Sequence, residues 1–288
     1  MIIIDGSYLS LLKDENILLK LDKALIPNIE NLDKRFMNQY FDQKNQFSMP
    51  YLWGTTGIAY NTKYITKPVT SWAIFWDPEY KGYTALLDDV LEFSAVDLRK
   101  LGYSANSENP DHLEKAQAEL LNQQAKIMSA MDIISYLAGR EGYIAQAYNG
   151  DAVAAMGANP DIKYVIPKEG GTIWMDNIAI SVSAKHSEAA HKFINFLLSP
   201  DNSARLVNYI QYASPLKKET YAHLVIPEIL NNPVIYPSQE DLDRCEMLRA
   251  TSTLAIHQNI LRTYKEHLTQ LSSESSKKTG LGLITTTI

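Results

Sequence analysis

The sequence lacks the residues and runs that mark several common protein classes. Its single cysteine, Cys245, excludes an intrachain disulfide framework and a metal site built on cysteines. No apolar run approaches the roughly 18 to 20 residues that a membrane-spanning helix needs. The apolar stretch after Met1 is too short for a signal peptide and lacks a basic start. Neither a disulfide-bonded scaffold nor an integral membrane protein is indicated.

The sequence also has fewer basic than acidic residues. The chain has 27 Lys and Arg against 33 Asp and Glu, which gives a formal net charge of −6. Such a balance disfavours nucleic acid and acidic membrane surfaces as partners and mildly favours a cationic ligand. With 288 residues, 45% of them hydrophobic, the chain can bury a sizeable core and has the composition of a globular protein with one or two lobes.

Motifs of common enzymes are also absent. The sequence has no nucleophile elbow, phosphate-binding loop or dinucleotide fingerprint, and its six histidines show no metal-ligand spacing. Asp89 and Glu92 are the best candidates for a general acid and base, but neighbours on one helical turn are poorly placed to flank a scissile bond. We therefore expect no enzymatic activity, no cofactor and no bound metal.

What the sequence does contain is an alternation of short strands and helices. Apolar runs predict strands over residues 2–4, 48–60, 84–87, 143–148, 162–166 and 172–182. Helical patterns cover residues 71–75, 90–101, 112–128, 129–136, 150–156, 187–197 and 242–268. Asn109 and Pro110 give a helix-start signal, and Ser187 is predicted to cap the helix that follows it. This alternation indicates an α/β protein with parallel sheets flanked by helices.

Four segments resemble one known family in both order and spacing. They are 49–56 (Met-Pro-Tyr-Leu-Trp-Gly-Thr-Thr), 71–82, 98–104 (Leu-Arg-Lys-Leu-Gly-Tyr-Ser) and 167–176 (Pro-Lys-Glu-Gly-Gly-Thr-Ile-Trp-Met-Asp). They resemble the bacterial periplasmic spermidine/putrescine-binding proteins, the solute receptors of polyamine ABC transporters. The similarity runs from about residue 2 to about residue 267.

The resemblance implies a two-lobed α/β periplasmic binding protein fold of type II, with a hinge and a ligand cleft between the lobes. We expect lobe 1 to comprise 1–57 and 177–227, lobe 2 to comprise 58–176 and 228–270, and 271–288 to form a disordered tail. Family members carry a signal peptide and a strand-helix-strand unit ahead of the strand that corresponds to residues 2–4. The resemblance therefore implies that both are missing from this chain.

A polyamine is an alkyl chain with ammonium groups at fixed spacing, so its site needs carboxylates for the charges and aromatic faces for the methylenes. The resemblance assigns this role to Asp89 and Glu92 at one end of the ligand, Asp176 at another amine, and the aromatic residues Trp174, Tyr8, Tyr148 and Tyr212. From spacing alone, Asp89 and Glu92 are better explained as acids at a helix N-terminus. Trp174 and Asp176 are equally well explained as a buried tryptophan beside a turn aspartate.

Two positions depart from the family pattern. Tyr148 stands where a tryptophan is common, which keeps an aromatic face but reduces its area. Leu248 stands where well-studied spermidine binders have a glutamine, so the choice between spermidine and putrescine stays open.

The implied function is capture of polyamines in the periplasm by a monomeric receptor that delivers them to an inner-membrane ABC permease. Two alternatives remain: a receptor of the same fold for another solute, such as ferric ion held by some of the 17 tyrosines, or a non-binding remnant. Acids interleaved with aromatic residues suit an amine-bearing alkyl chain better than a compact metal site.

Overall fold

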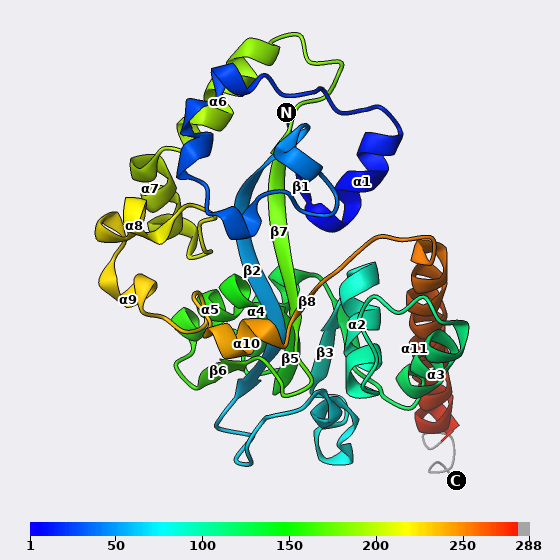
Figure 1. Ribbon diagram of the computed structural model, residues 1–288. Coiled ribbons are helices and arrows are strands. Elements are labelled where there is room, and N and C mark those ends of the chain that lie inside the picture. The colour runs from blue at the N-terminus through cyan, green and yellow to red at the C-terminus, as the bar shows by residue number, and fades with distance from the viewer. Residues whose placement is uncertain (282–288) are drawn as a thin grey trace.

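Two long strands organise the molecule. The computed structural model describes residues 1–281, and in it β2 (Ser48–Asn61) pairs antiparallel with β7 (Thr172–Ala179) along the middle of the protein (Figure 1). Around this pair a sheet forms in the order β1-β7-β2-β5-β3-β4, with β6 joined to β2 and β8 joined to β7. The predicted α/β class is confirmed. The sheet is mixed rather than parallel, because β1, β2, β5, β6 and β7 pair antiparallel wherever they meet.

One end of β2 and β7 carries a first group of elements, at the top of Figure 1. Its main elements are β1 (Ile2–Asp5), α1 (Gly6–Asp14), α6 (Ser187–Leu197), α7 (Pro200–Ile210), α8 (Lys218–Tyr221) and α9 (Pro227–Leu230). Short 3-10 turns fill much of the stretch from Lys23 to Asn45. Apolar side chains from residues 9–53 and 175–235, joined by Val153, form one buried core here.

The other end carries a second group. It comprises β3 (Thr84–Leu87), α2 (Val90–Lys100), α3 (Pro110–Leu120), β4 (Lys126–Met128), α4 (Ala130–Ala138), β5 (Ile144–Tyr148), α5 (Asn149–Ala158), β6 (Ile162–Val165), α10 (Gln239–Asp243) and α11 (Leu254–Leu281). Ile260, Leu261 and Tyr264 of α11 pack into a core with residues of 58–144. The exact lobe boundaries given above stay a prediction.

Several sequence-based expectations are corrected by long-range pairing. The helix predicted over 112–128 begins at Pro110 and ends at Leu120, because residues 126–128 instead form β4, which pairs in parallel with β3. The helix predicted over 242–268 is interrupted, since β8 (Glu246–Met247) pairs in parallel with Thr172 and Ile173.

Helix ends and the C-terminal segment need correction too. Ser187 is the first residue of α6, and the residue that caps the helix is His186, without a side-chain hydrogen bond. Ile194 of this helix is buried, whereas Phe193 and Phe196 are 44% and 52% exposed. α11 continues to Leu281, so 271–281 of the expected disordered tail are helical, and 282–288 lie outside the described residues. No helix among residues 1–281 is both long enough and apolar enough to span a bilayer.

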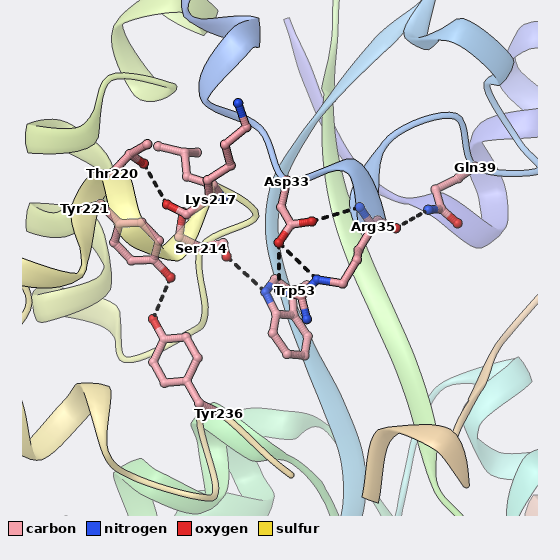
Figure 2. A network of polar contacts seen from close by, with 10 residues as sticks. Asp33, Arg35, Gln39, Trp53, Ser214, Lys217, Thr220, Tyr221 and Tyr236 are labelled. Carbon is pink, nitrogen blue, oxygen red and sulfur yellow. Dashed lines mark hydrogen bonds and ion pairs between the residues drawn. The ribbon is translucent and has the colours of Figure 1, made fainter. Parts of the chain in front are cut away.

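A polar network fastens the segment after α7 to β2 (Figure 2). The indole Nε1 of Trp53 donates to the carbonyl of Ser214 at 3.0 Å, and the backbone N–H of Trp53 donates to the carbonyl of Ala213 at 3.1 Å. Figure 2 also shows the hydroxyl pair of Tyr221 and Tyr236, 3.2 Å apart. Residue 212, one position before this anchor, is thereby held close to β2.

Candidate ligand-binding cavity

A cavity of about 480 Å³ lies between the two groups of elements, beside β7. All seven residues proposed from the sequence line it: Tyr8, Asp89, Glu92, Tyr148, Trp174, Asp176 and Tyr212. The structure adds eight lining residues that the sequence reasoning did not select as ligand groups: Asp5, Ser7, Tyr51, Leu52, Leu91, Ile173, Ile210 and Leu248. Segments far apart in the chain therefore converge on one site.

Strand β7 supplies one wall through residues two apart, which share a face of a strand. Thr172 lies opposite Thr56 of β2, and Trp174 lies opposite Gly54. Asp176 lies opposite Leu52 of β2 on one side of β7 and opposite Asp5 of β1 on the other side. The register of three strands thus sets which side chains meet at the cavity.

Asp89 reaches the cavity from the junction of β3 and α2. Its Oδ1 accepts hydrogen bonds from the backbone N–H groups of Leu91 at 3.0 Å and Glu92 at 2.9 Å, so it caps α2. Burial raises the pKa of the Asp89 carboxyl. Asp89 therefore both caps α2 and lines the cavity.

Glu92, in the first turn of α2, is only 4% exposed. The hydroxyls of Thr56 and Thr172 each donate to its Oε1 at 2.8 Å, and Thr172 also lies 2.9 Å from Oε2. Burial, followed by the charge of Asp89, raises the pKa of Glu92 to about 8. The two threonines orient the carboxylate but supply no positive charge to it.

Asp5 and Asp176 form a second acidic pair. They lie directly opposite each other across the β1–β7 ladder, where facing side chains are near neighbours. Burial, followed by the charge of Asp5, raises the pKa of Asp176 to about 6, and burial raises the pKa of Asp5 as well. The strand predicted over residues 2–4 stops before Asp5, and only the pairing with a strand far along the chain reveals the position of this residue.

In the part of the chain that the structure describes, these four acids are not matched by basic side chains. Among the described residues, no lysine, arginine or histidine lines the cavity. Within residues 1–281, none of the ion pairs involves Asp5, Asp89, Glu92 or Asp176. A buried carboxylate normally requires a counter-charge or hydrogen bonds to offset desolvation. Three of the four acids accept hydrogen bonds that offset part of this cost, and a cation in the cavity would supply the counter-charge.

Aromatic rings form the adjoining wall. Trp174 packs edge-to-face against Tyr148, with centroids 5.8 Å apart, and against Tyr212, with centroids 5.1 Å apart. The hydroxyl of Tyr212 donates to Asp151 at 3.1 Å, which fixes that ring. A Cβ on Gly150 would lie 2.2 Å from the Tyr212 ring, so this glycine makes room for it.

A β-bulge brings two consecutive residues of β2 to the same cavity. The pairing of β2 with β7 shifts between Pro50 and Leu52, which leaves Tyr51 without a partner in the ladder. Neighbouring residues of a regular strand point to opposite faces, whereas a bulge re-aims a side chain. Tyr51 and Leu52 both line the site as a result. Proline 50, which lacks a backbone N–H, fits the interrupted ladder.

Comparison with known proteins places this geometry in a family. The family model described as bacterial extracellular solute-binding protein matches residues 1–229. The spermidine/putrescine-binding periplasmic protein of Escherichia coli (strain K12) is 39% identical over 243 residues, which cover 83% of this chain and 69% of that protein. The spermidine/putrescine-binding periplasmic protein 1 of Haemophilus influenzae is 34% identical over 240 residues, covering 82% and 66%.

A solved structure agrees with these relatives. The spermidine/putrescine ABC transporter substrate-binding protein from Streptococcus pneumoniae superimposes with a TM-score of 0.81 at 30% identity, covering 92% of this chain and 83% of that one. These relatives are transport receptors rather than enzymes. The chain belongs to the bacterial extracellular solute-binding protein family.

Proposed function

We propose that this protein is a receptor for polyamines, which binds spermidine or putrescine in the cavity beside β7. One observation carries the proposal: four acidic side chains, which form no ion pair within residues 1–281, share a cavity with aromatic and apolar walls. An aliphatic polyamine supplies ammonium groups that pair with the acids and methylene groups that pack against the aromatic and apolar walls. In this binding mode Asp89 and Glu92 hold one end of the ligand and Asp176 holds another amine.

The aromatic residues cover the alkyl chain of the ligand. Trp174, Tyr148, Tyr212 and Tyr8 present ring faces or edges to the cavity, and Leu52, Ile173 and Leu248 add apolar area. A ring near an ammonium group contributes a cation–π attraction of about 0.5 to 2 kcal/mol. Carboxylate and sugar ligands fit less well, because the lining contributed by residues 1–281 contains no basic side chain.

The names of the relatives support the same ligand class. Two are named as spermidine/putrescine-binding periplasmic proteins, and the S. pneumoniae structure is named as the substrate-binding protein of a spermidine/putrescine ABC transporter. We extend this to the present chain: it acts as a monomer in the periplasm and delivers its ligand to an inner-membrane ABC permease.

Ligand binding is proposed to close the two groups of elements on each other. Cavity residues come from both groups, so a bound ligand makes contacts in the closed form that the open form lacks, and it favours closure by that difference. The strands β2 and β7 connect the two groups and are the natural hinge. Small-angle scattering should show a smaller radius of gyration at saturating spermidine, and an unchanged radius would count against the hinge.

Isothermal titration calorimetry of the full chain tests the ligand assignment. We expect heats of binding with spermidine and putrescine, and none with iron(III) chelate or with glutamate as an anionic control. Binding of iron(III) in place of the amines would support a ferric receptor. Absence of heat with every ligand, from a protein shown to be folded by circular dichroism, would support the non-binding remnant.

A further inference from the structure

Asp5 is one of the four acids that line the cavity, but the binding mode proposed above assigns no ammonium group to it. It ends β1 and lies opposite Asp176 in the antiparallel ladder. Facing residues in such a ladder have Cβ atoms about 4.5 to 5.5 Å apart, and like charges at that distance destabilise the pair. Both residues line the cavity. A cation between them would convert this repulsion into attraction.

The protein itself needs the shape of Asp5 but not its charge. Asp5 caps α1, and its Oδ1 accepts hydrogen bonds from the backbone N–H of Ser7, at 2.8 Å, and from the Ser7 hydroxyl. Asparagine and serine cap helices about as well as aspartate. No ion pair of the described chain uses Asp5. Its negative charge therefore has no structural partner.

The charge of Asp5 acts on every other acid of the site. Together with burial and neighbouring groups, it raises the pKa values of Asp89, Glu92 and Asp176. A diamine brings two positive charges to these four carboxyl groups. A triamine or tetraamine brings three or four, and so neutralises more of the mutual repulsion.

Resting on the polyamine function above, we infer that Asp5 is a ligand-binding carboxylate that selects polyamines with three or more ammonium groups over diamines. Because Asp5 faces Asp176 and both line the cavity, the additional ammonium group of the larger ligand is held by the two facing carboxylates, above the β1–β7 ladder. Asp5 thereby determines specificity in the same cavity, beyond the residues that bind every polyamine.

The test compares spermidine with putrescine, by calorimetry, on the full chain and on Asp5→Asn, which keeps the helix cap and removes the charge. We expect Asp5→Asn to weaken spermidine binding about tenfold or more and putrescine binding by less than about threefold. The loss is larger for spermidine because its additional ammonium group is the one that pairs with Asp5. Asp22→Asn is the matched control. Asp22 also caps a short helix in the first group, through Ala24 N–H at 3.0 Å, but is exposed and does not line the cavity.

The possible outcomes separate this inference from the function on which it rests. If the unmodified chain binds neither amine, the polyamine function fails, and the role of Asp5 fails with it. If the unmodified chain binds both amines and Asp5→Asn changes neither affinity, or lowers both equally, only the inference about Asp5 is overturned. Asp5→Ser, a second uncharged cap, must reproduce the selective loss. Unfolding of both variants would show that the charge serves the fold, and would also overturn the inference.

Discussion

A side chain at position 54 would collide with the ring of Trp174. A Cβ built on Gly54 would lie 2.4 Å from Cζ2 of that indole and 2.3 Å from Oδ1 of Asn149. Gly54 and Trp174 are direct partners in the β2–β7 ladder. The indole therefore occupies space that only glycine leaves open, and its place in the cavity wall depends on the neighbouring strand.

Gly54→Ala should weaken polyamine binding without touching the ligand. The added methyl group displaces the Trp174 ring, and the expected loss is about 1 to 2 kcal/mol, the scale of a lost cation–π contact. Calorimetry with spermidine gives the affinity, and thermal unfolding separates it from lost stability. Gly157→Ala is the control, because that exposed helical glycine has open space around its Cβ position. Equal affinities in the two variants would contradict the dependence on Gly54.

Removing the ring itself gives an independent check. Trp174→Ala should weaken spermidine binding by about 1 to 2 kcal/mol, through loss of stacking on the alkyl chain and of the cation–π attraction. Trp174→Phe keeps an aromatic face and should recover part of that loss. If Ala and Phe variants bind as tightly as the unmodified chain, the aromatic wall has no part in ligand binding.

The acids should matter more than the ring. Asp89→Asn and Asp176→Asn each leave an ammonium group in the dehydrated cavity with its charge unmatched, at a cost of roughly 2 to 5 kcal/mol of binding. Asp111→Asn, in the first turn of α3 and outside the cavity, should leave the affinity unchanged. Neutral results at both cavity acids would refute the polyamine assignment.

The stability of the unliganded protein should fall between mildly acidic and mildly basic pH. The pKa of Glu92 rises from 4.5 to about 8 on folding, so between these values the folded state retains a proton that the unfolded chain has released. Stability from this group is then full below about pH 4.5 and is lost as the pH rises toward 8. Thermal unfolding should show a weaker decline for Glu92→Gln than for the unmodified chain.

Exposed Glu114 provides the control for that experiment. Glu114→Gln should leave the pH dependence as it is, because the residue lies on the solvent side of α3. An identical decline in the Glu92→Gln protein and in the unmodified chain would show that Glu92 does not titrate in this range.

Local signals placed two acids of the site at a junction of strand and helix, and the resemblance to a known family selected them as ligand groups. Asp89 and Glu92 follow a buried strand and open a helix, and both features are readable over a dozen residues: β3 ends at Leu87 and α2 begins at Val90. The resemblance to a known family then directed attention to Asp176 and to the aromatic residues, and all of them line the cavity. Their roles in binding stay predictions.

Long-range pairing explains what the sequence could not reveal. Asp5 follows the strand predicted over residues 2–4, and only the register of β1 on β7 makes it a cavity residue. Residues 126–128 read as the end of a helix, yet they form β4 because β3 accepts a parallel partner there. Tyr51 reaches the cavity through a bulge that depends on two strands at once. The neighbouring residues in the sequence are not enough to predict any of these three features.

A crystal structure of the chain with spermidine tests the central claim most directly. The account predicts an extended ligand inside the cavity, with one ammonium group near Asp89 and Glu92, and another at about 2.7 to 2.9 Å from the Asp176 carboxylate, as in charge-assisted hydrogen bonds. Its methylene groups should lie against Trp174. A spermidine molecule bound outside this cavity, or inside it without contact to Asp89 or Asp176, would contradict the account.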